Sequence, residues 1–101
     1  MNLIIAPRAK IDLNEIWQWN AVNYSAEHGD FYLELLWENI FDLPNNYLRG
    51  TVVPNRPYTR TLLIQQKPRR HGHFIIYDIV EQESISVLRI VHSARDWQKL
   101  I

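Results

Sequence analysis

The C-terminal third of this 101-residue chain contains two apolar runs separated by a short polar turn. Residues 74–80 and 85–91 are rich in the β-branched and aromatic side chains that strands prefer, and only residues 81–84 connect them. So short a connection predicts an antiparallel hairpin, because parallel strands need a crossover of a dozen residues or more. The second run leads directly to His92 and Arg95, polar residues that a buried strand does not require. We therefore look for function where the sheet ends in this polar cluster.

The length and composition are those of one ordinary globular domain. The hydrophobic share is 47% and the charged share 22%, and a chain of 101 residues can bury a core without disulfides or metals. Cysteine is absent, which excludes disulfides, thiol nucleophiles and cysteine-bearing zinc sites. No segment approaches the roughly 20 apolar residues of a membrane span, and the N-terminal charge pattern is not that of a signal peptide. We expect a single cytoplasmic domain over residues 1–101, with no membrane contact.

Helical periodicity dominates the first half of the chain, after a short strand predicted at residues 2–6. Pro7 suits the first turn of a helix, where its missing N–H is not needed, and Ser25 is a candidate N-cap for a second helix. The residues with the 3–4 spacing of a helix face are Ala9, Leu13, Ile16, Asn20 and Tyr24, and then Leu33, Leu36, Trp37, Ile40 and Leu43. The short link between the two helices predicts an antiparallel helical hairpin.

Residues 44–57 are rich in proline and asparagine and are predicted as a loop, followed by a strand at 59–65. The predicted order β-α-α-β-β-β is an α+β fold, with an antiparallel helical hairpin packed on one face of a small, mostly antiparallel twisted sheet. Strand alternation places Val87, Arg89 and Val91 on one face of the last strand. Because burying a lone charge is costly, we expect this face to be open, partly apolar and suited to binding.

The formal net charge of zero conceals an asymmetry between the two halves of the chain. Residues 1–47 carry two basic and seven acidic side chains, whereas residues 48–101 carry nine basic and four acidic ones. Such a division indicates one basic surface able to meet an anionic partner. A solvated acidic helical surface beside an ordinary basic one explains the same numbers equally well.

The segment 67–73, KPRRHGH, is the most basic stretch of the chain and is predicted as a turn. Its arginines, Arg69 and Arg70, are candidates for phosphate contacts, and a solvated hairpin turn is an equally good interpretation. His71 and His73 resemble a metal-binding pair, but no neighbouring carboxylate or cysteine completes a site. We therefore predict no metal.

Most aromatic side chains fall on the helix faces or in the strands and are predicted to lie in the core. Trp19 and Tyr32 lie off the cleanest helical stripes, so we expect them to be exposed at a partner surface. Trp97 follows the last strand and is expected to hold the C-terminal tail against the sheet.

Several motifs recur in a fixed order over nearly the whole chain. They are Ala9, Leu13 and Ile16 in the first helix, IFDLP at residues 40–44, TRTL at 59–62, FIIY at 74–77 and VLRIVHSARDW at 87–97. In this order the motifs resemble the RelE/ParE superfamily of toxins from bacterial type II toxin–antitoxin pairs, and more closely its ParE branch. The last motif is the sharpest, since it is similar to the ParE-type pattern I-L-R-V-x-H-x-x-R-D.

The resemblance implies a small toxin that inhibits DNA gyrase, and thereby replication, by protein binding. A cognate antitoxin would neutralise it through a disordered, acidic segment that folds on the basic sheet face. DNA would be contacted only through the complex with the antitoxin, and no cofactor is implied. On this resemblance, the residues assigned to antitoxin or target binding are Arg60, Arg69, Arg70, Arg89, His92, Arg95 and Trp97.

The RelE branch of the same superfamily gives an alternative function, a ribosome-dependent endonuclease of messenger RNA. His92 would then act as general acid or base, while Arg60, Arg89 and Arg95 would hold the phosphate. Two departures weaken this alternative. Asp78 follows the strand tyrosine where relatives often have arginine, and a pI of about 6.9 gives little positive field for RNA. Two further alternatives stay open. His92 has a structural role only, or the chain is a decayed family member without toxicity.

Overall fold

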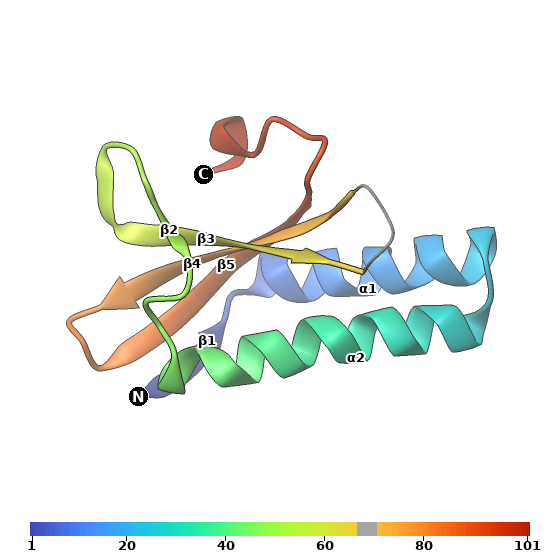
Figure 1. Ribbon diagram of the computed structural model, residues 1–101, viewed down its shortest axis with the longest axis horizontal. Helices are drawn as coiled ribbons and strands as arrows, with labels where there is room; N and C mark the ends of the chain where they lie inside the picture. Colours follow the sequence, from blue (N-terminus) through green and yellow to red (C-terminus); the bar gives the residue numbers. More distant parts are fainter. Residues whose placement is uncertain (67–70) are drawn as a thin grey trace.

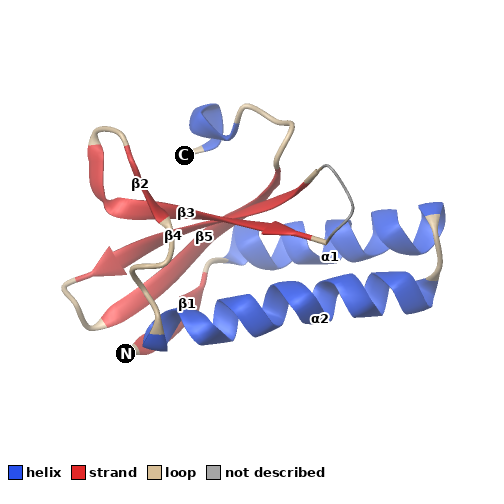
Figure 2. Ribbon diagram, viewed as in Figure 1, coloured by secondary structure: helices blue, strands red, loops and turns tan. Residues whose placement is uncertain are grey.

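The computed structural model describes residues 1–66 and 71–101, which form a helical hairpin packed on a five-stranded sheet (Figure 1; Figure 2). The elements are β1 (Asn2–Ile5), α1 (Pro7–Asn23), α2 (Ala26–Asp42), β2 (Thr51–Val53), β3 (Arg56–Gln65), β4 (Gly72–Val80) and β5 (Ser84–His92), with 3-10 turns at Leu43–Asn45 and Trp97–Leu100. The predicted α+β class is confirmed. Within the described residues, neither helix has both the length and the hydrophobicity that crossing a bilayer requires.

The sheet has the strand order β1-β5-β4-β3-β2 and is antiparallel except for the pairing of β1 with β5. The predicted strands appear with ends shifted by at most three residues. The loop predicted for residues 44–57 is wrong in part, since it contains β2 and the start of β3. Asn55 turns the chain between them with a φ of 65°, a left-handed conformation that asparagine tolerates better than most residues. A strand as short as β2 carries too few residues for its alternation to be recognised.

The two helices begin as the sequence predicts and pack closely where they meet. Pro7 occupies the first turn of α1, and the Ser25 hydroxyl caps α2 by accepting a hydrogen bond from the backbone N–H of His28 at 3.0 Å. Gly29 lies against Trp17, whose indole Nε1 donates to Asp30 at 2.7 Å. The missing side chain of Gly29 therefore permits the close approach of the two helices.

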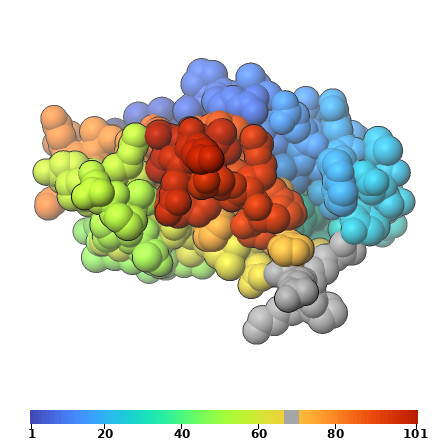
Figure 3. Space-filling model, turned by 90° about the horizontal axis from the view of Figure 1, so that it is seen from above, coloured from blue at the N-terminus to red at the C-terminus, as the bar shows by residue number. Residues whose placement is uncertain are grey.

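The hydrophobic core lies between the helical hairpin and the sheet. It is built from the predicted helix faces and from alternate residues of the strands, namely Ala9, Leu13, Ile16, Tyr32, Leu36, Ile40, Leu43, Ile64, Ile75, Tyr77, Ile85, Val87 and Ile90. The C-terminal segment lies on the opposite face of the sheet, and in Figure 3 it covers the middle of that face in red. There the ring of Trp97 packs on Phe74 at a centroid distance of 5.9 Å.

The prediction that Val87, Arg89 and Val91 share one open face is wrong for two reasons. Val87 pairs with Tyr77 and Arg89 with Ile76, so Leu88 is an extra residue that interrupts the alternation. Val87 consequently belongs to the core beneath the helices. The face that carries Arg89 is not open either, since Val91 beside it is only 2% exposed.

Candidate functional site

A pocket of about 690 Å³ lies between the helical hairpin and one end of the sheet. The far end of the hairpin, where α1 meets α2, extends beyond the strands (Figure 1). All four histidines of the chain line the pocket, although they are scattered over 64 positions: His28, His71, His73 and His92. We call this space the histidine pocket. Its other lining groups include Asp12, Glu15, Trp19, Tyr24, Tyr32, Gln66 and Arg95.

Three of the histidines contact one another through their rings. His73 lies 5.2 Å from His92 in an edge-on arrangement, and His71 lies 5.6 Å from His92, measured between ring centroids. The hydroxyl of Tyr32 lies 2.6 Å from Nδ1 of His73. Tyr32 is buried at 6% exposure, so the expectation that it lies exposed is wrong, whereas Trp19 is 57% exposed as predicted.

Burial lowers the pKa of two of these histidines, His73 and His92. Desolvation, followed by repulsion from His92, lowers the pKa of His73 to about 4, although Asp12 acts in the opposite direction. Burial and the proximity of His71 lower the pKa of His92 as well. Both imidazoles are therefore neutral near pH 7, and each presents a donor and an acceptor rather than a charge.

The imidazole nitrogens are partly engaged by the protein itself. Nδ1 of His92 accepts a hydrogen bond from the backbone N–H of Ala94 at 3.1 Å, and Nδ1 of His73 faces the Tyr32 hydroxyl. Among residues 1–66 and 71–101, no three histidine, aspartate or glutamate side chains are arranged to hold a metal ion. The pocket therefore combines neutral imidazoles and aromatic walls with the charged side chains of Asp12, Glu15 and Arg95.

Arg89, a predicted binding or catalytic residue, is held inside the protein. Its Nε donates to Asp12 Oδ2 at 2.8 Å and its Nη2 to Oδ1 at 3.2 Å, and its side chain is only 13% exposed. Asp12 itself is 4% exposed and also lies 3.3 Å from Arg8. Sequence reasoning missed Asp12, although an acid beside the apolar residues of a helix face signals a buried partner. The geometry gives Arg89 a bridging role between α1 and β5.

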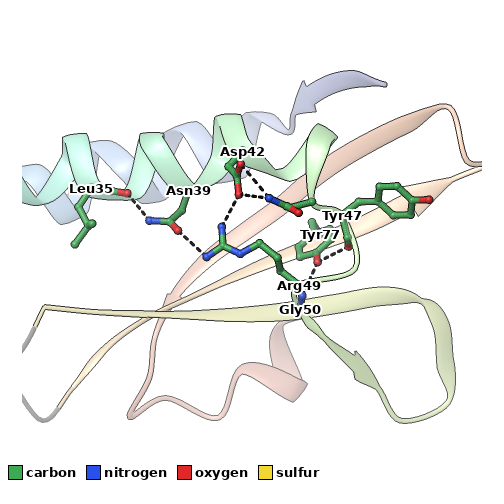
Figure 4. A network of polar contacts seen from close by, with 8 residues as sticks. Leu35, Asn39, Asp42, Tyr47, Arg49, Gly50 and Tyr77 are labelled. Atoms are coloured by element: carbon green, nitrogen blue, oxygen red, sulfur yellow. Dashed lines mark hydrogen bonds and ion pairs between the residues drawn. The ribbon is translucent and has the colours of Figure 1, made fainter.

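Arg60, the second predicted arginine, binds backbone carbonyls at the end of the loop that precedes β2. Its Nη1 donates to the carbonyl of Gly50 at 2.7 Å and to that of Leu48 at 3.2 Å. The same loop is held by the buried phenol of Tyr77, which donates to Tyr47 O at 2.7 Å and accepts from Gly50 N at 3.0 Å (Figure 4). The guanidinium of Arg60 thus belongs to a structural network.

Figure 4 also shows how this loop is joined to the end of α2. Arg49 donates to Asp42 at 2.9 Å and to Asn39 at 3.1 Å, and Asn39 in turn donates to the carbonyl of Leu35 at 2.8 Å. Together with the Tyr77 contacts, these bonds fix the connection between the helical hairpin and the sheet.

The remaining predicted residues have different environments. Arg95 is exposed and lines the histidine pocket together with His92. Trp97 holds the C-terminal segment on Phe74. Arg69 and Arg70 lie outside the described residues. The structure therefore brings together His92 and Arg95, while Arg60 and Arg89 lie elsewhere in internal contacts.

The fold and the site define the class of protein. A helical hairpin on this sheet, with the signature of β5 ending in a pocket, is the arrangement that the resemblance to ParE-type toxins implies. A family model described as the ParE toxin of the type II toxin–antitoxin system, parDE, matches residues 3–97. The chain therefore belongs to the ParE toxin family.

Comparison with solved structures agrees with this assignment at the level of the fold. A structure described as the chromosomal ParDE toxin–antitoxin system from P. aeruginosa superimposes with a TM-score of 0.73. The sequences are 24% identical, and the match covers 90% of this chain and 94% of the other. No curated protein sequence matches this chain.

Proposed function

We propose that this ParE-family toxin arrests growth in the cytoplasm by binding and poisoning DNA gyrase, and that a cognate antitoxin neutralises it. The observation that carries this proposal is the engagement of the arginines in internal contacts. Of the three arginines that a nuclease would use, Arg60 binds backbone carbonyls and Arg89 binds Asp12. Moving either guanidinium to hold a phosphate would break these contacts, among them the bidentate pairing of Arg89 with the buried carboxylate of Asp12. A mode of action by protein binding requires no such rearrangement.

The surface of the helical hairpin supports a protein partner. Trp19 is 57% exposed, Val22 84% and Tyr24 51%, and all three lie near the end of α1. Trp19 and Val22 are three positions apart on one helix, so they lie on the same face. Exposed apolar side chains that cluster in this way indicate a surface for a protein partner.

Induction of this chain alone in a bacterium with a DNA-damage reporter tests the proposal. Growth arrest with a strong reporter signal is the expected result, because a poisoned gyrase leaves broken DNA. Purified gyrase should then accumulate cleaved plasmid in the presence of the toxin, and co-expression of the antitoxin should restore growth. Normal growth with soluble, folded protein would contradict toxicity and favour the decayed family member.

One observation favours a second function, cleavage of messenger RNA on the ribosome. The histidine pocket brings His71, His73, His92 and Arg95 together, which are groups able to move a proton and to hold a phosphate. This function predicts growth arrest with a silent DNA-damage reporter and new 5′ ends in messenger RNA. Under it, His92→Gln abolishes the new ends while the toxin keeps its fold and its affinity for the antitoxin.

A further inference from the structure

The wall of the histidine pocket contains a polar atom that the fold does not use. Oε1 of Gln66 is buried and has no hydrogen-bond partner, and it is the one side-chain atom of this kind in the described part of the chain. Gln66 follows the last residue of β3 and lines the pocket. An unpaired buried acceptor is unfavourable in the free protein, so it gains from a donor that enters the pocket.

The uncompensated charge of the pocket is positive. The acids among its lining residues already face arginines: Asp12 lies 2.8 Å from Arg89, and Glu15 lies 3.7 Å from Arg8. For Arg95, by contrast, no carboxylate of residues 1–66 or 71–101 lies within 4 Å. An occupant that carries a carboxylate beside the pocket would therefore meet a free guanidinium.

The rim of the pocket is apolar and continues beyond it. Trp19 and Tyr24 line the pocket and pack edge to face at a centroid distance of 5.8 Å, and both are more than half exposed. Val22, one helical turn from Trp19, extends the apolar surface outside the pocket. A mononucleotide or another small molecule would fill the pocket and leave this rim uncovered, whereas a polypeptide segment would cover both.

We propose that the histidine pocket is the anchor site for the antitoxin. An apolar or aromatic side chain of the antitoxin enters the pocket, with a hydrogen-bond donor placed on Oε1 of Gln66 and an acidic residue on Arg95. The flanking segment lies across Trp19 and Val22. This inference rests on the proposed function, since it names the surface that the neutralising partner occupies.

Calorimetric titration with the protein encoded by the reading frame next to the toxin gene tests the inference. Trp19→Ala should weaken binding by about tenfold or more, as loss of an aromatic anchor does. Gln66→Met should weaken it by about fivefold, because the donor of the partner loses its acceptor. The melting temperature of Gln66→Met should not fall, which separates a binding role from a structural one. Arg95→Gln should weaken binding and flatten its dependence on salt.

Tyr58→Ser is the matched control, since Tyr58 is an aromatic residue with 71% exposure that lies outside the pocket. Its affinity for the antitoxin should equal that of the wild type. If the wild type binds but the three pocket variants bind as tightly as it does, the anchor site is wrong and the proposed function stands. If the wild type does not bind at all, the proposed function fails and the anchor site fails with it. Uptake of a mononucleotide by the pocket with unchanged antitoxin binding would also overturn the inference.

Discussion

The carboxylate of Asp12 on α1 binds β5 at two points, the guanidinium of Arg89 and the backbone N–H of Ile90, the latter at 2.9 Å. The reason lies in the topology. The pairing of β1 with β5 ends at Ile5 and Val87. Beyond Val87, the side of β5 that faces away from β4 has no neighbouring strand among the described residues. Asp12 replaces the missing strand as hydrogen-bond acceptor. One side chain thus satisfies an edge amide and compensates a charge at the junction of helix and sheet.

Asp12→Ala should destabilise the protein by roughly 3 kcal/mol, because it leaves the poorly exposed guanidinium of Arg89 and an amide of β5 unpaired. Urea denaturation measures this free energy of unfolding. Asp96→Ala is the control, since Asp96 is 54% exposed and lies 3.6 Å from Lys99, and its effect should stay within about 0.5 kcal/mol. Equal effects of the two substitutions would contradict the role given to Asp12.

Tyr77→Phe should destabilise the protein by about 1–3 kcal/mol, because the carbonyl of Tyr47 and the N–H of Gly50 lose their shared partner. Exchange of the Gly50 amide with deuterium should accelerate in the same variant. Burial raises the pKa of Tyr77 above 10.0, so only the unfolded state releases the phenolic proton just above pH 10. Stability should therefore fall with rising pH above this value.

In Tyr77→Phe this alkaline decline should be smaller, which denaturation curves between pH 9 and pH 11 would reveal. Tyr58→Phe serves as the control, since Tyr58 is 71% exposed. Its loss of the hydroxyl should leave both the stability at pH 7 and the exchange of the Gly50 amide unchanged. An unchanged exchange rate in Tyr77→Phe would show that the phenol does not fix this loop.

Gly72→Ala should disrupt the start of β4. A methyl group at this position would collide with the backbone carbonyl of Ile64 on β3, and backbone cannot yield as a side chain can. We expect a loss of about 2 kcal/mol or more, of the order caused by overpacking a close-packed interior. The chemical shifts of His73 should change too, because Gly72 precedes it in the same strand. Circular dichroism during thermal unfolding measures the loss of stability.

Gly29→Ala is the informative comparison for Gly72→Ala. There the added methyl group would meet the Trp17 indole at 3.1 Å and its carbonyl at 3.2 Å, contacts that small shifts relieve. The helix gains about 1 kcal/mol of propensity from the same change, so the net effect should be small. A larger loss of stability in Gly29→Ala than in Gly72→Ala would show that the packing of the two helices tolerates an added methyl group less well than the packing of β3 and β4.

The parts of this fold that could be predicted are those with a repeated pattern. Both helices show 3.6-residue periodicity and β5 is a nearly continuous apolar run, so each was identified from its own residues. Leu88 interrupts the alternation of β5 without any change in composition. The sequence therefore predicted the wrong face of the sheet for the side chain of Val87. The ion pair of Asp12 and Arg89 joins residues 77 positions apart, which local patterns cannot reveal.

The sequence grouped residues of the pocket only where they are neighbours in one motif. His92 and Arg95 stand in one motif and do line one pocket. His28 and Tyr32 reach the same pocket from α2, which depends on the crossing of the helices over the sheet. Gln66 has no sequence signal at all, because its importance comes from burial without a partner.

The stability of the protein should fall as the pH falls from 6.5 to about 4, the interval between the ordinary pKa of histidine and that of His73. In this interval the unfolded state binds a proton that the folded state does not accept, so acidification favours unfolding. The loss in the free energy of unfolding that His73 causes should reach at most about 3 kcal/mol at pH 4.

In His73→Gln the free energy of unfolding should fall less steeply between pH 6.5 and pH 4, whatever the stability of this variant at pH 7. His92→Gln, which removes the repulsion from His92 that is the second cause of the shift, should raise the pKa of His73 in an NMR titration of its ring protons. If His73 of the wild type titrates near 6.5, then neither burial nor the neighbouring His92 lowers its pKa, and this prediction is wrong.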